Sequence, residues 1–275
     1  MKKTDSQVYQ RLQEIPEKFC YLMVGHLIGN APIGEDRKNV TLLIKAFYET
    51  FKNKQQTPAL ILKTSRASSS YMDRREIQKV IDNIRKSVGA RTLPNIYLLH
   101  GDFKDHEMNE LYNHPKVKAM VMLTKGEGFG RPLLEFSLTN KPIITTGWSG
   151  HIDFLKPEFS ALIGGELKPI HQAAQVKDML IEGSQWFSPD HGQIGYFMKD
   201  VYEKYKDWKV KGKRQGYYSR SSFNFDKMQE KLGEILDKNI PELPKRIELK
   251  LPEKRKIKLP KLVSLKENTP PSKEN

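Results

Sequence analysis

Residues 125–135 read Lys-Gly-Glu-Gly-Phe-Gly-Arg-Pro-Leu-Leu-Glu and lie between an apolar run at 117–123 and a helical pattern at 132–138. The apolar run predicts a buried strand, and Pro132 suits the first turn of a helix, where its missing N–H would be unpaired anyway. Glycines allow positive φ and a close approach to a ligand, and the free N–H groups at a helix start favour phosphate. The segment therefore predicts a strand, a glycine-rich turn and a helix around a phosphorylated ligand.

The same alternation of apolar runs and helical patterns extends on both sides of this segment. Other strands are expected at 19–24, 59–62, 95–99, 142–146 and 160–163, with helices at 38–51, 72–88, 105–112 and 151–155. This alternation predicts an α/β fold with a parallel sheet covered by helices on both faces. Because right-handed crossovers bring the carboxyl ends of the strands to one edge, we expect the ligand site at that edge.

Composition divides the 275 residues into three parts. Residues 1–18 are polar, with a short helical pattern. Residues 19–238 form the expected single Rossmann-like domain, whose last strand is at 160–163 and whose helical C-terminal segment, 176–236, is broken near 187–189 and near Gly212. Residues 239–275 are rich in Pro and Lys without helical periodicity, which predicts a disordered basic tail.

The charge and the cysteine content limit the classes of protein. A formal net charge of +14 favours an anionic partner, such as nucleotide phosphate, nucleic acid or an acidic membrane surface, but it also fits a solubilising lysine-rich surface. Cys20 is the single cysteine, so no intramolecular disulfide can form, and the sequence has no Cys and His cluster typical of a metal site. Without an apolar signal segment or a long apolar run, a cytoplasmic protein is expected.

Two common phosphate-binding motifs do not fit the glycine-rich segment. Its spacing is G-x-G-x-G on the fourth expected strand, whereas a dinucleotide fingerprint has G-x-G-x-x-G on the first. The following strand at 142–146 also lacks a terminal acidic residue to hold a ribose. No G-K-[ST] sequence follows the glycines, which excludes a P-loop.

Instead, the segment resembles the signature of glycosyltransferase family 4, retaining enzymes with the GT-B fold. The E-x7-E pair of that family stands here as Glu127 and Glu135. The G-G-x-x-E turn that follows one strand later reads Ser-Gly-His-Ile-Asp at 149–153, with Ser for the first Gly and Asp for Glu. Weaker similarities lie at 96–102, 105–112 and 223–226. The resemblance covers roughly 21–236 and implies the C-terminal, donor-binding half of a GT-B fold.

The resemblance implies roles for the matched residues. Glu127 is expected to be the catalytic residue that binds hydroxyls of the donor sugar, Glu135 to hold the ribose and Lys38 to hold the pyrophosphate. The remaining donor-binding residues are expected to be Arg37, Gly128, Phe129, Gly130, Gly101, which precedes the base-binding loop, and His26, which replaces an arginine of the family. The alternatives are that Glu135 only complements a helix dipole and that Lys38 is a solvated surface lysine.

The implied function is metal-independent transfer of a hexose from a nucleotide sugar to an unknown acceptor, without a cofactor. The acceptor domain of the family is not visible. The chain is therefore expected to be a fragment, a split-gene half whose partner chain carries that domain, or a reduced protein with another partner. A non-catalytic nucleotide-sugar-binding module is the alternative. The basic tail adds an acidic membrane surface as an expected partner, whereas nucleic acid is disfavoured because the tail lacks interleaved aromatic residues.

Overall fold

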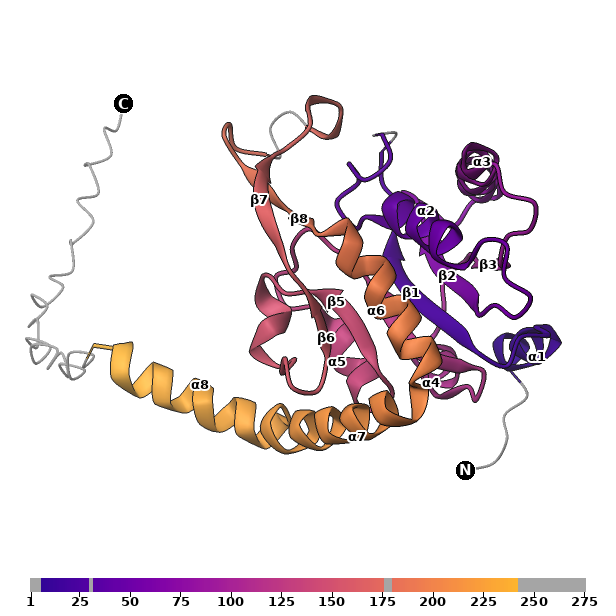
Figure 1. The fold of residues 1–275 in the computed structure, drawn as a ribbon. Coiled ribbons are helices and arrows are strands. Elements are labelled where there is room, and N and C mark those ends of the chain that lie inside the picture. The colour runs from indigo at the N-terminus through magenta and orange to yellow at the C-terminus, as the bar shows by residue number, and fades with distance from the viewer. Residues whose placement is uncertain (1–5, 30–31, 176–179, 242–275) are drawn as a thin grey trace, which may run out of the picture. The chain divides into compact units, whose positions relative to one another are not determined.

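The computed structural model describes residues 6–29, 32–175 and 180–241 and contains a parallel sheet with helices on both faces (Figure 1). The sheet has six strands in the order β3-β2-β1-β4-β5-β6, and all neighbouring pairs are parallel. The strands are β1 (Cys20–His26), β2 (Ala59–Ser65), β3 (Ile96–Leu99), β4 (Val117–Met122), β5 (Ile143–Thr146) and β6 (Ala161–Ile163). The α/β fold and all six expected strands are therefore confirmed. In this doubly wound order, the topology reverses between β1 and β4.

The side chains of β1 alternate between two hydrophobic cores, one on each face of the sheet. Tyr21 and Met23 belong to one core, and Cys20 and Leu22 belong to the other. Full burial of such an apolar side chain contributes about 1.5–3 kcal/mol. The first core is closed by α2 (Val40–Phe51), α3 (Tyr71–Val88) and α6 (His191–Glu203), and the second by α1 (Gln7–Glu14), α4 (Asp105–Asn113) and α5 (Arg131–Ser137).

The region after β6 differs from the expectation. Strand β6 is not the last, because β7 (Gly165–Pro169) and β8 (Gln185–Pro189) form an antiparallel hairpin. Strand β8 lies in the segment from 176 onward where helices were expected. All residues of β7 are exposed and Leu167 is its one large apolar residue, so the strand has no apolar run from which it could be recognised. The expected interruption at 187–189 is part of β8. Residues 176–179 lie outside the described residues.

The helix break expected near Gly212 is also wrong, since α7 (Tyr205–Ser222) runs through it and the break lies at Lys204. Gly212 is a packing residue. A Cβ atom at Gly212 would lie 2.8 Å from the backbone carbon of Lys141, and one at Gly216 would lie 2.8 Å from the carbonyl oxygen of Ser137. The two glycines allow α7 to approach the backbone that follows α5.

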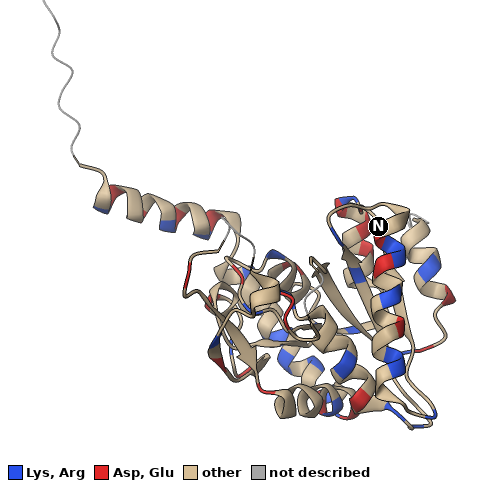
Figure 2. Ribbon diagram, turned by 90° about the horizontal axis from the view of Figure 1, so that it is seen from above, with Lys and Arg blue, Asp and Glu red and all other residues tan. Residues whose placement is uncertain are grey.

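The chain divides into two compact units, residues 1–231 and 232–275. Helix α8 (Phe225–Asn239) begins in the first unit and ends in the second. The predicted basic tail falls almost entirely on residues 242–275, which lie outside the described residues, so its disorder stays a prediction. In the described part, Lys and Arg are spread over several helices (Figure 2), and no helix there has the length and apolar composition to cross a bilayer.

We expect Gly212→Ala to lower stability although alanine is the better helix former. Alanine normally gains about 0.8–1.0 kcal/mol over glycine in a helix, but the clash with the Lys141 backbone should cost about 1–3 kcal/mol. Thermal melting followed by circular dichroism measures the difference. Gly233→Ala is the control, because Gly233 lies in α8 with no atom within 4 Å of an added Cβ. An unchanged or higher melting temperature for Gly212→Ala would contradict the packing role.

Candidate functional site

The loops that follow β1 and β4 are joined at the carboxyl edge of the sheet. The amide of Lys125 donates to the carbonyl of Arg37 at 3.0 Å, and the Arg37 guanidinium donates to the carbonyl of Gly126 at 2.9 Å. The side-chain amide of Asn39 donates to the Leu123 carbonyl at 2.7 Å. Doubly wound sheets bind ligands where the strand order reverses, which in this sheet is between β1 and β4.

At this point the ammonium group of Lys38 forms an ion pair with the Glu127 carboxylate. Their side chains are only 13% and 10% exposed. Burial lowers the pKa of Lys38, the hydrogen bond and the charge of Glu127 oppose this shift, and nearby Arg37 adds to it. Lys38 is thus largely withdrawn from water and paired with a carboxylate, and a solvated surface lysine does not describe it.

The glycine-rich turn leads into α5 as expected, but the helix starts earlier relative to Glu135. Gly130 precedes the helix with φ of 85°, and Pro132 lies in its first turn. A Cβ atom at Gly130 would lie 3.0 Å from the Cβ of His151. Because α5 begins at Arg131, its first turn has no acidic residue. Glu135 therefore lies beyond the first turn of α5, and its alternative role as a partner of the helix dipole is not supported.

The turn after β5 is bonded to the backbone of Glu127. The hydroxyl of Ser149 accepts from the Glu127 amide at 3.1 Å and donates to its carbonyl at 2.6 Å, and the Gly150 amide donates to the same carbonyl at 3.0 Å. A Cβ atom at Gly150 would lie 2.8 Å from the carbonyl carbon of Gly128. Ser149 has φ 83° and ψ −169°, a conformation that favours glycine. Serine is held there by its hydrogen bonds to the Glu127 backbone.

His151 stabilises this turn through a buried hydrogen bond. Its side chain is fully buried, and Nε2 lies 2.6 Å from the Thr146 carbonyl. Since a carbonyl only accepts, Nε2 carries the proton of the neutral ring. Burial lowers the pKa of His151, which favours that neutral form. His151 thus fixes the start of the 3-10 turn η1 (Gly150–Asp153).

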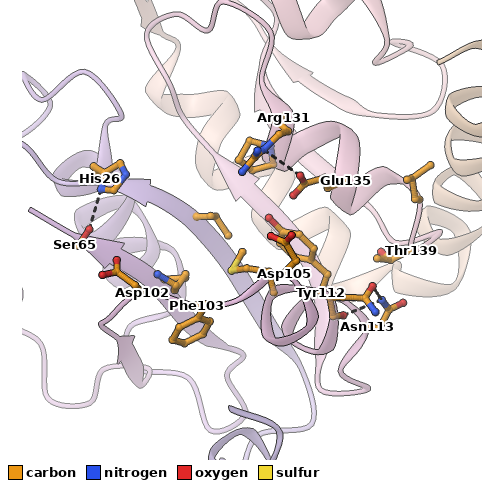
Figure 3. A pocket seen from close by; sticks show the side chains of 16 residues that line it. His26, Ser65, Asp102, Phe103, Asp105, Tyr112, Asn113, Arg131, Glu135 and Thr139 are labelled. Atoms are coloured by element: carbon orange, nitrogen blue, oxygen red, sulfur yellow. Dashed lines mark hydrogen bonds and ion pairs between the residues drawn. The ribbon is translucent and has the colours of Figure 1, made fainter. Parts of the chain in front are cut away.

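A cavity of about 650 Å³ lies beside the ion pair, between the ends of β1 and β2 and the helices α4 and α5. His26 and Ser65 face Arg131 and Glu135 across it (Figure 3). His26 hydrogen-bonds Ser65 at 2.9 Å, and Arg131 Nε lies 3.1 Å from a Glu135 oxygen. The lining does not include Glu127. The structure therefore separates the two expected glutamates into neighbouring sites.

Two further residues of the cavity were not singled out from the sequence as site residues. Lys63 Nζ donates to the Gly101 carbonyl at 2.7 Å, and burial lowers its pKa against the opposing charge of Asp102. Burial and the neighbouring Glu135 raise the pKa of Tyr112. The signal for Lys63 was its position near the end of β2, whereas Tyr112 read as an ordinary apolar helix residue. Gly101 has φ of 126° and contributes backbone rather than lining.

The remaining expected donor-binding residues lie in the turn itself. Phe129 is 42% exposed and packs against Phe154, with 5.3 Å between the ring centroids. Gly128 lies against the Gly150 turn. In the described ranges, no group of three or more His, Cys, Asp and Glu side chains is placed to hold a metal ion.

No protein-family model matches this sequence, and a search of curated proteins finds no match. Solved structures do match. The C-terminal domain of a glycosyl transferase group 1 family protein (LpcC) from Francisella tularensis aligns with 81% of this chain and 94% of its own, at 16% identity and a TM-score of 0.54. HepE from Anabaena, solved with UDP and glucose, aligns over 86% of this chain and 53% of its own, at 13% identity and a TM-score of 0.53.

A glycosyltransferase from Rickettsia africae gives a similar result, with 86% of this chain, 52% of its own, 13% identity and a TM-score of 0.54. The chain thus spans about half the length of the HepE and Rickettsia proteins. These similarities establish the fold, which is that of the C-terminal domain of GT-B glycosyltransferases.

We expect Ser149→Ala to destabilise the protein more than Ser149→Gly. Both variants lose the hydroxyl bonds to Glu127, but glycine also removes backbone strain of about 1–3 kcal/mol, whereas alanine keeps it. Thermal or urea unfolding of both variants measures the order. Equal stabilities, or a less stable glycine variant, would show that the backbone of Ser149 is not strained.

Proposed function

We propose that this chain binds a nucleotide sugar across the carboxyl edge of its sheet, as the donor-binding half of a retaining glycosyltransferase that transfers a hexose. The observation that carries the proposal is the largely buried Lys38–Glu127 pair at the switch point, beside a cavity that contains Glu135. The resemblance of 127–135 to glycosyltransferase family 4 and the fold point in the same direction.

The diphosphate is proposed to replace Glu127 as the partner of Lys38. A hydrogen bond from Lys38 to a phosphate oxygen contributes about 1.5–3 kcal/mol, as does its bond to the Glu127 carboxylate. Lys38 can therefore exchange one anion for the other without being left unpaired. Glu127, once released, accepts hydrogen bonds from hydroxyls of the donor sugar. As the sugar leaves, the nucleoside diphosphate gains negative charge, and Lys38 with Arg37 stabilises it in place of a metal ion.

The nucleoside half is proposed to occupy the cavity. Its volume of about 650 Å³ is in the range of small-molecule sites. Glu135 can accept hydrogen bonds from both ribose hydroxyls, and the side chain of His26 and the backbone at Gly101 border the base. The backbone of Gly128, Phe129 and Gly130 is proposed to complete the donor site. HepE was solved with UDP and with UDP-glucose, which makes these two compounds the first probes.

The acceptor side is proposed to come from a partner domain or chain. A further partner is proposed to contact helix α8, because apolar residues are exposed along this helix at helical spacing. They are Phe225, Met228, Leu232, Ile235 and Leu236. The basic tail is proposed to reach an acidic membrane surface rather than nucleic acid, and a cytoplasmic location stays a prediction. The alternative function, a non-catalytic nucleotide-sugar-binding module, is separated by measuring donor turnover in the presence of a purified acceptor domain.

We expect Glu127→Ala and Glu135→Ala to affect different ligands. Glu135→Ala should weaken UDP and UDP-sugars alike, roughly 10- to 150-fold for a lost charged hydrogen bond. Glu127→Ala should weaken only the sugar-bearing ligand. UDP makes no contact with Glu127 and no longer has to displace its carboxylate from Lys38, so UDP binding should not weaken.

Calorimetry with chelator present measures both, using UDP, UDP-hexoses and GDP-mannose, and exposed Glu158→Ala is the control. Equal effects of the two substitutions on UDP would show that the roles are wrongly assigned. No binding of any nucleoside diphosphate to the unmodified chain would refute the proposed function.

The pH dependence of UDP binding is expected to shift in Glu127→Gln. Binding needs charged Lys38, so affinity falls as pH rises through the pKa of Lys38 in the free protein. Removing the carboxylate leaves the pKa-lowering effects of burial and Arg37 unopposed. The loss of affinity should therefore begin at a lower pH in Glu127→Gln than in the unmodified protein, and calorimetry in a series of alkaline buffers measures it. Identical profiles would contradict a link between Lys38 and Glu127.

A further inference from the structure

Trp148 and Phe187 form a two-ring stack beside the proposed sugar end of the site. Their ring planes are 5° apart, with 6.0 Å between centroids. Phe187 is 5% exposed, whereas Trp148 is 42% exposed. An indole that is packed on one face and nearly half exposed presents its other face to solvent.

The stack is held to the same loops that carry the ion pair. The amide of Phe187 donates to the carbonyl of Lys125 at 3.2 Å, two residues before Glu127. The amide of Gly147 donates to the Ile163 carbonyl at 2.8 Å, and the hydroxyl of Ser149 bonds the Glu127 backbone. The two neighbours of Trp148 in the chain, Gly147 and Ser149, are thus held by hydrogen bonds, which makes the exposed face of Trp148 pre-organised for a ligand.

The order of the strands places Trp148 beyond the sugar end of a bound nucleotide sugar. The cavity proposed for the nucleoside lies between the ends of β1 and β2 and the helices α4 and α5, and β5 is two strands beyond β1 in the order β3-β2-β1-β4-β5. Lys38 follows β1, Glu127 follows β4 and Trp148 follows β5. A ligand with its base in the cavity and its diphosphate at Lys38 therefore has its sugar directed toward Trp148.

We propose that Trp148 is a stacking platform for a pyranose ring, either the sugar of the donor or a ring of a saccharide acceptor. One face of a pyranose carries C–H groups, which suit the apolar, electron-rich face of an indole. The neighbouring Glu127 carboxylate supplies an acceptor for the hydroxyls at the rim of that ring. A nucleobase is not the ligand, because its place is in the cavity at the opposite end. This inference rests on the proposed function for the direction of the bound donor.

The test compares probes with and without a pyranose. Binding of UDP, UDP-glucose, UDP-galactose and UDP-N-acetylglucosamine is measured by calorimetry for the unmodified chain, Trp148→Leu and Trp148→Phe. Trp148→Leu should leave UDP unchanged and weaken the pyranose-bearing ligand roughly 2- to 13-fold, the range for one aromatic stacking contact. Trp148→Phe, which keeps a flat ring, should retain most of the affinity. Tyr217→Leu, at an exposed aromatic on α7, is the control.

A second measurement records the response of the unmodified chain itself. The chain has three tryptophans, so its indole N–H groups give three NMR signals that single substitutions assign. If the platform takes the donor sugar, a UDP-sugar shifts the Trp148 signal and UDP alone does not. If it takes an acceptor ring, methyl glucoside, galactoside, mannoside or N-acetylglucosaminide shifts that signal with UDP bound. The signal of buried Trp208 should stay unchanged.

The outcomes separate this inference from the proposed function. UDP binding with no response of Trp148 to any pyranose overturns the platform alone, as does an equal loss of UDP and UDP-sugar in Trp148→Leu. A response of Trp148 to methyl pyranosides without any binding of a nucleoside diphosphate supports the platform and overturns the proposed function. Absence of both kinds of binding overturns both.

Discussion

The Lys38 ammonium group is largely withdrawn from water and paired with the Glu127 carboxylate, and this contact organises the carboxyl edge of the sheet. Removing one member of a fully buried pair typically costs about 3–5 kcal/mol, because the other charge stays desolvated. The cost is smaller for this pair, whose side chains are 13% and 10% exposed. The pair therefore holds the loops after β1 and β4 together in the free protein. A ligand that brings its own anion to Lys38 can take the place of Glu127 without leaving Lys38 unpaired. The same contact thus stabilises the empty site and favours a diphosphate.

The surrounding structure holds the side chains of Lys38 and Glu127 in contact. The doubly wound strand order brings β1 and β4 side by side, so that their loops meet although Lys38 and Glu127 are far apart in the chain. The turn at Ser149 and Gly150 fixes the Glu127 backbone, and the neutral ring of His151 fixes that turn. The proposed functions of the cavity and of Trp148 depend on this arrangement, because the cavity is proposed to lie on one side of the ion pair and Trp148 on the other.

The six strands of the central sheet were predictable, because continuous apolar runs bounded by glycine or polar residues are typical of buried parallel strands. The β7–β8 hairpin was not, since β7 is fully exposed and is held by backbone pairing rather than by burial. The helix break expected at Gly212 was wrong for a related reason. A glycine inside a helix suggests a break unless the backbone against which it packs is known. In the site, residues 127–135 predicted the turn and helix α5 that follow β4, but spacing alone does not reveal that Glu127 pairs with Lys38 while Glu135 faces a separate cavity.

The exchange of partners at Lys38 is the central claim, and a crystal structure of the chain with UDP tests it most directly. The account predicts that Lys38 Nζ lies within hydrogen-bond distance of a diphosphate oxygen, that the Glu127 carboxylate has moved away from Lys38, and that the ribose contacts Glu135. UDP bound with the Lys38–Glu127 pair intact and no phosphate contact to Lys38 would contradict it.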